Sequence, residues 1–235
     1  MRLLLSSDAL PDAGLDVLHQ ACRRRALAGL ELSLGAEQAH GLDEQACPLH
    51  QQHGSPCVPE DVSSVVWLRL PRAASLIMTM IWSGAAHQMK AGLLLQEPLP
   101  APPAATRMAL VHGSDPAEAR AAAGWARRHG ARTCWEVTPG MLEPDRMERI
   151  LEAALPTMAH VRLPGSGPEA EAPESAGTGS LLARLALSGY AGTISLVPSP
   201  GADLALWRRW LLDRRGWGCG TAAEKQARRA AATAS

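Results

Sequence analysis

Eight short apolar runs recur along the chain, separated by longer stretches with helical spacing, and this alternation restricts the fold most strongly. The runs are almost continuously apolar, which is typical of strands buried on both faces of a parallel sheet. Strand–helix–strand crossovers of this length give parallel, right-handed connections. The runs cover residues 2–6, 29–34, 65–70, 92–96, 108–112, 133–137, 158–163 and 192–197.

The stretches between these runs carry the start and stop signals of helices. Pro116 and Pro144 stand where a first helical residue is expected, and Gly130 follows the first of these helices as a stop. The apolar run 73–82 is about ten residues long, so we read it as a buried helix. The other predicted helices cover residues 13–28, 116–129, 144–154, 181–187 and 203–215.

The count of eight strands predicts an α/β fold, a (β/α)8 TIM barrel that is small or partly degenerate. A doubly wound open sheet would give the same local pattern, so the closed barrel depends on the count. Residues 55–58 could be the third strand instead, which would shift the register up to Thr133. We expect one barrel domain over residues 1–218 and a flexible tail over 219–235. A proline-rich turn is expected at 98–103, and a long loop at 164–179.

Composition excludes several classes of function. Lys and Arg together number 23, as do Asp and Glu, which argues against a nucleic-acid groove. No apolar run approaches the roughly 20 residues that cross a bilayer, and Asp8 interrupts the first run before a signal peptide could form. The five cysteines include no CxxC pair, which favours buried free thiols. We therefore expect a cytoplasmic protein that binds a small molecule, with its oligomeric state left open.

Three motifs, in order and spacing, resemble the sugar phosphate isomerase/epimerase family, the xylose isomerase-like barrels. Gly29-Leu30-Glu31-Leu32 is similar to the family's second strand, and Ala159-His160-Val161-Arg162-Leu163 to its seventh-strand "H-V-H-L" stretch. The segment 189–196 (GYAGTISL) resembles the approach to the eighth strand. The resemblance is best over residues 130–215, fair over 1–35 and poor between them.

The resemblance implies a divalent metal, Mn, Mg, Co or Zn, bound by side chains on strands five to eight. Glu136 matches the strand-six acid and His160 the strand-seven histidine. Strand five offers His112, or Glu97 if the alternative register holds. The metal would polarise a carbonyl and its neighbouring hydroxyl while carboxylates move a proton between adjacent carbons. Glu31, Glu136 and Arg162 are the candidate catalytic residues, with Arg162 steadying an anionic group.

The sequence also departs from the family pattern. Val197 stands where the strand-eight glutamate is expected, and Arg162 replaces the second histidine of the seventh-strand motif. Glu136 could form a structural ion pair with Arg162, and His160 could be a hydrogen-bonded core histidine. Two hypotheses follow. One is an isomerase or epimerase of small sugars or polyhydroxylated carbonyl compounds. The other is a barrel that has lost its metal and serves as a binding or scaffolding protein.

Overall fold

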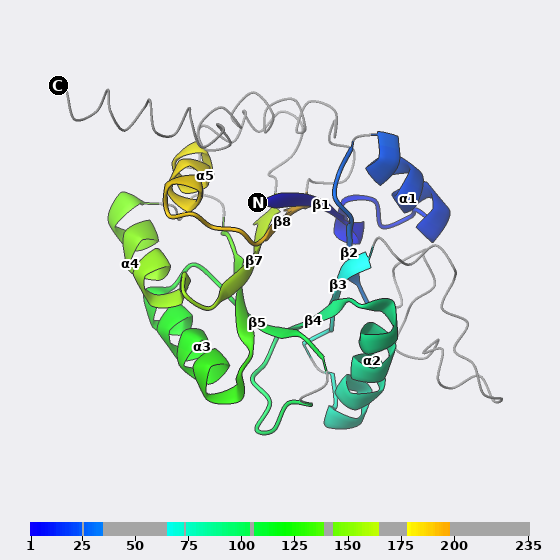
Figure 1. Ribbon diagram of the computed structural model, residues 1–235, viewed down its shortest axis with the longest axis horizontal. Coiled ribbons are helices and arrows are strands. Elements are labelled where there is room, and N and C mark those ends of the chain that lie inside the picture. Colours follow the sequence, from blue (N-terminus) through cyan, green and yellow to red (C-terminus); the bar gives the residue numbers. More distant parts are fainter. Residues whose placement is uncertain are drawn as a thin grey trace.

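The computed structural model describes residues 1–24, 26–34, 65–72, 74–103, 106–138, 143–164 and 178–197. Eight parallel strands pair in chain order and close into a barrel, because the last strand also pairs with the first. Helices surround this ring (Figure 1). The strands are β1 (Arg2–Ser6), β2 (Leu30–Ser33), β3 (Val65–Arg69), β4 (Gly92–Leu95), β5 (Met108–His112), β6 (Arg132–Glu136), β7 (Met158–Pro164) and β8 (Thr193–Val197).

This topology confirms the closed barrel and all eight predicted strands. Each predicted strand end lies within one residue of the observed end. Leu3 of β1 pairs with Ile194 of β8, and the same register continues to Leu5 and Leu196. The alternative strand at 55–58, the helix at 203–215, the tail at 219–235 and the loop residues 165–177 lie outside the described residues.

The helix α3 (Pro116–His129) begins and ends at caps that the sequence supplies. The Asp115 side chain accepts a hydrogen bond from the Ala117 amide at the start of α3, and Gly130 ends this helix with a φ of 61°. The helical elements are η1 (Ser7–Ala9), α1 (Leu15–Arg24), α2 (Leu76–Met89), α3 (Pro116–His129), α4 (Pro144–Ala154) and α5 (Thr178–Leu187).

Three predicted helices differ from expectation. The helix predicted at 13–28 is shorter, because α1 ends at Arg24 and residues 26–28 are not helical, and the helix predicted at 181–187 begins earlier, at Thr178 of α5. The apolar run 73–82 forms the first half of α2, which continues through Ser83 and Gly84 to Met89. Leu76, Ile77 and Met80 are exposed by 49–71%, so this helix lies on the surface with one face buried rather than inside the core. Along the described ranges, no helix combines the length and apolarity needed to span a bilayer.

The connection from β4 to β5 contains no helix in its described residues, 96–103 and 106–107. The proline-rich segment predicted at 98–103 is confirmed as irregular chain, but it is only partly exposed: Pro98, Pro100 and Ala101 are exposed, whereas Leu99, Pro102 and Pro103 are half-buried. The Trp125 Nε1–H of α3 donates a hydrogen bond to the Leu99 carbonyl at 2.9 Å and so holds this turn against the helix. The outer face of β5 is therefore covered by a short turn and by α3.

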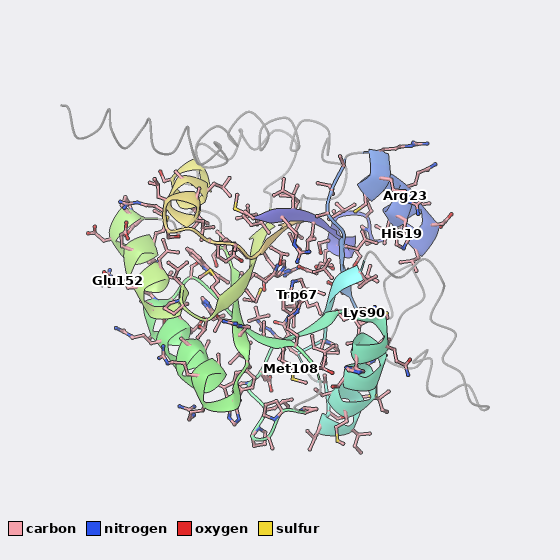
Figure 2. The ribbon with its side chains drawn as sticks, viewed as in Figure 1. His19, Arg23, Trp67, Lys90, Met108 and Glu152 are labelled. Atoms are coloured by element: carbon pink, nitrogen blue, oxygen red, sulfur yellow. The ribbon has the colours of Figure 1, made fainter. Side chains whose placement is uncertain are left out.

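Two apolar clusters fill the space between strands and helices, and a third lies inside the barrel. Figure 2 shows the Trp67 side chain within the ring of strands, whereas Glu152 projects from the outside of α4. The inner cluster comes from five strands and forms an apolar floor below their carboxyl ends. Its buried members are Leu4, Trp67, Leu94, Ala109 and Cys134.

Candidate functional site

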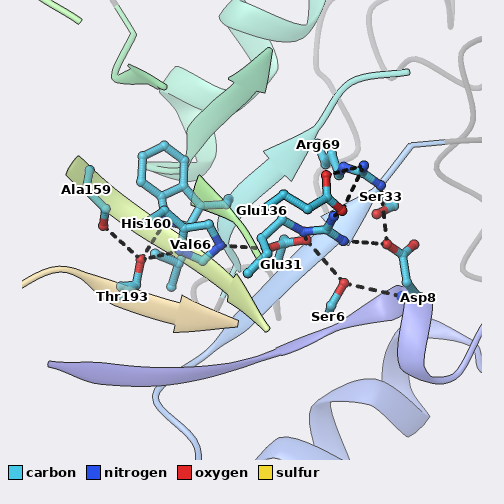
Figure 3. Close-up of polar contacts among 12 residues, drawn as sticks. Ser6, Asp8, Glu31, Ser33, Val66, Arg69, Glu136, Ala159, His160 and Thr193 are labelled. Carbon is cyan, nitrogen blue, oxygen red and sulfur yellow. Dashed lines mark hydrogen bonds and ion pairs between the residues drawn. The ribbon is translucent and has the colours of Figure 1, made fainter. Parts of the chain in front are cut away.

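Polar side chains lie directly above this floor because strand side chains on one face recur every second residue. Leu4 is followed by Ser6, Trp67 by Arg69, Cys134 by Glu136 and His160 by Arg162. These polar groups therefore gather at the carboxyl ends of the strands, where barrels of this type carry their active sites. We call six of them the mouth cluster: Asp8, Glu31, Arg69, Glu136, His160 and Arg162. Figure 3 labels all of these residues except Arg162.

Arg162 lies at the centre of the mouth cluster, with a side chain that is 1% exposed. Its Nε donates to Glu31 Oε1 at 2.7 Å and its Nη2 to Asp8 Oδ2 at 2.6 Å. Its Nη1 donates to Glu136 Oε1. One guanidinium thus uses all three of its nitrogens on carboxylates from η1, β2 and β6, and the fixed fork of its donors holds the three groups in place.

Glu31 joins this guanidinium to a histidine. Both Glu31 and His160 have side chains that are 0% exposed, and His160 Nε2 lies 2.7 Å from Glu31 Oε2. Because an ionised carboxylate only accepts, the Nε2 atom carries the proton of this bond. His160 Nδ1 lies 2.7 Å from Thr193 Oγ1, which also accepts from Trp67 Nε1 at 2.9 Å. Both ring nitrogens of His160 are therefore engaged.

The charge of Glu31 is fixed by its neighbours. Burial alone raises the pKa of this carboxyl, but the Arg162 charge and the His160 hydrogen bond outweigh burial and hold the pKa well below 4.5. Burial likewise opposes the charge of Arg162, yet Glu31, Glu136 and Asp8 raise its pKa above the ordinary value. The pair is therefore ionised throughout the neutral pH range.

Arg69 of β3 closes the outer side of the mouth cluster. Its Nη2 lies 3.1 Å from Glu136 Oε2 and its Nη1 3.5 Å from Asp8 Oδ2. With its amide oxygen turned toward this guanidinium, Gln96 accepts from Arg69 Nε at 2.6 Å. The side chains of Arg69, Asp8 and Glu136 are 25%, 23% and 32% exposed, so this is the side of the cluster that solvent reaches.

A cavity of about 910 Å³ adjoins the solvent-exposed side of the mouth cluster. Glu136, Gln96, His112, Arg72 and Arg146 are among its lining residues. Trp125 and Arg128 of α3 also line it, beside the β4–β5 turn. Of the six residues of the mouth cluster, Glu136 is the one that both forms ion pairs and lines the cavity.

The two strand-five candidates do not join the mouth cluster. His112 shares a face of β5 with Leu110, which packs with Trp125 and Ala122 of α3 on the outside of the barrel. His112 Nδ1 lies 3.0 Å from the Gly113 carbonyl, so this nitrogen carries the hydrogen; burial lowers the pKa of His112 below 6.5. Glu97, beyond the end of β4, is exposed.

These positions do not fit a divalent metal at the predicted ligands. Among the described residues, which include all four, no group of three or more His, Cys, Asp or Glu side chains could hold a metal ion. His160 has no free ring nitrogen, and the Glu136 oxygens face two guanidinium groups whose charge repels a cation. The four residues Glu97, His112, Glu136 and His160 therefore do not form the shared site that the resemblance implied.

The structure does bring together the other candidates, Glu31, Glu136, His160 and Arg162. The pairing of Glu136 with Arg162, which the sequence left open, is present. Sequence reasoning missed Asp8, Arg69 and the hydroxyl of Thr193. A usable signal existed for Arg69, because it stands two residues after the inward-facing Trp67 at the carboxyl end of its strand.

Comparisons with known proteins support the fold. The chain is similar in structure to 3-keto-D-glucoside 4-epimerase, YcjR, from E. coli, with a TM-score of 0.60 at 10% identity, over 92% of this chain and 99% of that one. An uncharacterised protein from Parabacteroides distasonis aligns with a TM-score of 0.51 at 9% identity, over 90% and 96% of the two chains. No protein-family model matches the sequence, and no curated protein matches it.

Proposed function

We propose that this barrel is a sugar isomerase- or epimerase-like protein that acts on a small sugar or another polyhydroxylated carbonyl compound. The observation that carries the proposal is the position of Glu136, which belongs both to the buried charge network and to the wall of the 910 Å³ cavity. The likeness of the whole fold to a keto-glucoside epimerase is consistent with this substrate class.

In this proposal Glu136 accepts the proton from the carbon next to the substrate carbonyl. The C–H electron pair moves toward the carbonyl oxygen, and a neighbouring guanidinium stabilises the negative charge that develops there. Glu136 gives an isomer when it returns this proton to the former carbonyl carbon, while the proton of the neighbouring hydroxyl moves to the former carbonyl oxygen. An epimer forms when water delivers a proton to the opposite face of the same carbon and Glu136 releases its proton to solvent. No metal takes part in any of these steps.

Arg69 is the guanidinium assigned to the developing charge. Its contacts to Glu136 and Asp8, at 3.1 and 3.5 Å, are longer than those of Arg162 to Glu31 and Asp8, and its side chain is 25% exposed. A substrate oxygen can therefore draw Arg69 away from its partners at a lower cost than the buried Arg162. Arg162 remains in place and positions Glu136.

The test is turnover of a panel of aldoses, ketoses, keto-sugars and their phosphate esters, followed by NMR of the products. We expect one of these compounds to be interconverted, and Glu136→Gln to slow the reaction by about 10²–10⁴-fold. Glu148→Gln, which removes the carboxylate of an exposed ion pair with Arg184, is the matched control and should leave the rate unchanged. Equal turnover by Glu136→Gln and the unaltered protein would exclude Glu136 as the proton acceptor.

A second candidate is a binding protein without turnover. It is favoured by the burial of Glu31, His160 and Arg162, which engage one another and leave Glu136 as the member of the mouth cluster that lines the cavity. In that case a member of the panel raises the melting temperature of the protein, Glu136→Gln weakens this effect, and no product forms.

A further inference from the structure

The cavity of about 910 Å³ reaches both faces of β5. Val111 lies on the inner face of this strand, Leu110 and His112 lie on the outer face, and all three line the cavity. Glu136 at the barrel mouth and Gly113, which follows β5, line it as well. The cavity therefore runs from the mouth over the end of β5 into the space between this strand and α3.

This outer part of the cavity lies where the regular barrel pattern places a helix. In a (β/α)8 barrel each strand is followed by a helix, whereas the described residues between β4 and β5 contain none. Figure 1 shows this connection as a loop between α2 and α3. We call this part the outer compartment, and its lining residues from the loop, from β5 and from α3 are Pro98, Leu110, His112, Ala121, Ala122 and Trp125.

His112 gives the outer compartment a buried hydrogen-bond acceptor. Its Nδ1–H donates to the Gly113 carbonyl at 3.0 Å, and burial lowers its pKa below 6.5, so the ring is neutral and Nε2 carries a lone pair. This Nε2 atom is buried and has no hydrogen-bond partner among the residues that the structure describes. Because an unpaired buried acceptor is costly, a ligand that brings a hydroxyl donor to this place is favoured.

The wall of the cavity carries charges of both signs. Three separate segments supply its arginines, Arg72, Arg128 and Arg146. The acidic side chains that line the same cavity are Glu97, Asp115, Glu118 and Glu136. Because the two signs nearly balance, the wall suits a neutral polyhydroxylated ligand better than a strongly charged one.

The size of the cavity exceeds what one sugar ring needs. Its volume of about 910 Å³ is near the upper end of the range of about 300–1,000 Å³ for pockets that bind drug-sized molecules. A single sugar ring is smaller than such a molecule and would leave the outer compartment unfilled. A second ring offers hydroxyl donors for His112 and an apolar C–H face for Leu110 and Trp125.

We propose that the substrate is a neutral reducing disaccharide, with its carbonyl unit at Glu136 and its second ring in the outer compartment, where a hydroxyl donates to His112 Nε2. The inference rests on the proposed function for the reacting unit. Binding of the second ring does not depend on turnover, so the two are tested separately.

The test is calorimetric binding of maltose, cellobiose and lactose, compared with D-glucose, the unit that carries the carbonyl in all three. We expect at least one disaccharide to bind about tenfold or more tightly than D-glucose. Ala121→Trp, at an exposed position of α3, should fill the outer compartment and remove this preference. Leu187→Trp places the same side chain at a position of α5 that is 78% exposed, and this control should keep the preference.

His112→Phe keeps a ring in this place but removes the acceptor. It should weaken binding of the preferred disaccharide by about threefold to tenfold, the worth of one hydrogen bond, and leave that of D-glucose unchanged. Because Ala121 is exposed, Ala121→Trp decides the question even if His112→Phe does not fold.

The inference is overturned if none of the three disaccharides binds more tightly than D-glucose, or if Ala121→Trp keeps the preference. It is also overturned if folded His112→Phe binds the disaccharide as tightly as the unaltered protein, since a water molecule would then satisfy Nε2. An intact preference without turnover of any compound would instead exclude the proposed function alone.

Discussion

Arg162 Nε donates to Glu31 Oε1 across 2.7 Å, between two side chains that are 1% and 0% exposed. The two residues are 131 positions apart in the sequence, on β7 and β2, so this bond ties opposite parts of the barrel at its mouth. His160 and Thr193 extend the same network to Trp67 on the barrel floor. The interactions that tie the barrel together at its mouth therefore also hold the candidate catalytic residues in place.

Replacing Glu31 with Gln should destabilise the protein strongly. The change leaves the buried Arg162 with one carboxylate fewer and removes the charged acceptor of His160, and losing one partner of a buried pair costs about 3–5 kcal/mol. Chemical denaturation measures this loss in the free energy of unfolding. Glu148→Gln breaks an exposed pair and should cost less than about 1 kcal/mol. If both variants lose the same free energy of unfolding, the buried ion pair of Glu31 adds no more to stability than the exposed pair of Glu148 and Arg184.

Stability should fall as the pH drops below about 4.5. The unfolded chain protonates Glu31 near 4.5, whereas the folded protein holds the pKa of this carboxyl well below that value, so the unfolded state binds more protons in acid. This one group then contributes a slope of up to about 1.4 kcal/mol per pH unit. The free energy of unfolding should be measured between about pH 3 and pH 6, on both sides of about 4.5. Its slope against pH should be smaller for Glu31→Gln than for the unaltered protein. If Glu31→Gln leaves this slope unchanged, Glu31 is not a source of the acid dependence of stability.

A second pH effect should come from His112. Its folded pKa is lowered by burial, so the unfolded chain takes up a proton near pH 6.5 while the folded protein does not, and stability falls as the pH decreases through this range. His112→Gln should remove that part of the dependence, as measured by thermal unfolding. His87→Gln, on the exposed side of α2, should retain it.

Gly92 should not tolerate a side chain. A Cβ at this position of β4 would collide with the Trp67 ring, which hydrogen-bonds to Thr193 and lies 5.6 Å from the His160 ring, centroid to centroid. Gly92→Ala should therefore cost about 1–3 kcal/mol in the free energy of unfolding. A Cβ at Gly124, inside α3, would instead have the Arg128 Nη1 atom as its nearest neighbour, at 3.6 Å. Gly124→Ala should therefore stabilise the protein by up to about 1 kcal/mol. Similar effects of the two changes would show that Trp67 can move aside.

The barrel could be predicted from the sequence because each strand is a short apolar run, and helix signals separate most of these runs. Pro116, Pro144 and Gly130 mark helix ends that the structure reproduces. The exposed face of α2 was missed because Leu76, Ile77 and Met80 are apolar, and a local apolar run does not reveal which of its sides is covered.

The candidate site could be predicted only in part. Glu31, His160 and Arg162 stand in recognisable strand motifs, but the sequence does not show which oxygen meets which nitrogen. That pairing depends on the barrel register, which sets Glu136 beside Arg162 on adjacent strands. Asp8 lies just beyond β1, where strand periodicity gives no direction for its side chain. His112 was a strand-five candidate from the family resemblance alone, and the resemblance does not show that it shares a strand face with Leu110, which packs on the outside of the barrel.

The central claim is that Glu136 moves a substrate proton at this mouth without a metal. The most direct measurement is deuterium incorporation, followed by NMR, into a bound polyhydroxylated carbonyl compound in ²H₂O, with the protein stripped by a chelator. We predict label at the carbon next to the carbonyl with the unaltered protein and at least about a hundredfold slower labelling with Glu136→Gln. Labelling that needs added metal, or a compound that binds in the cavity and never exchanges, would contradict the account.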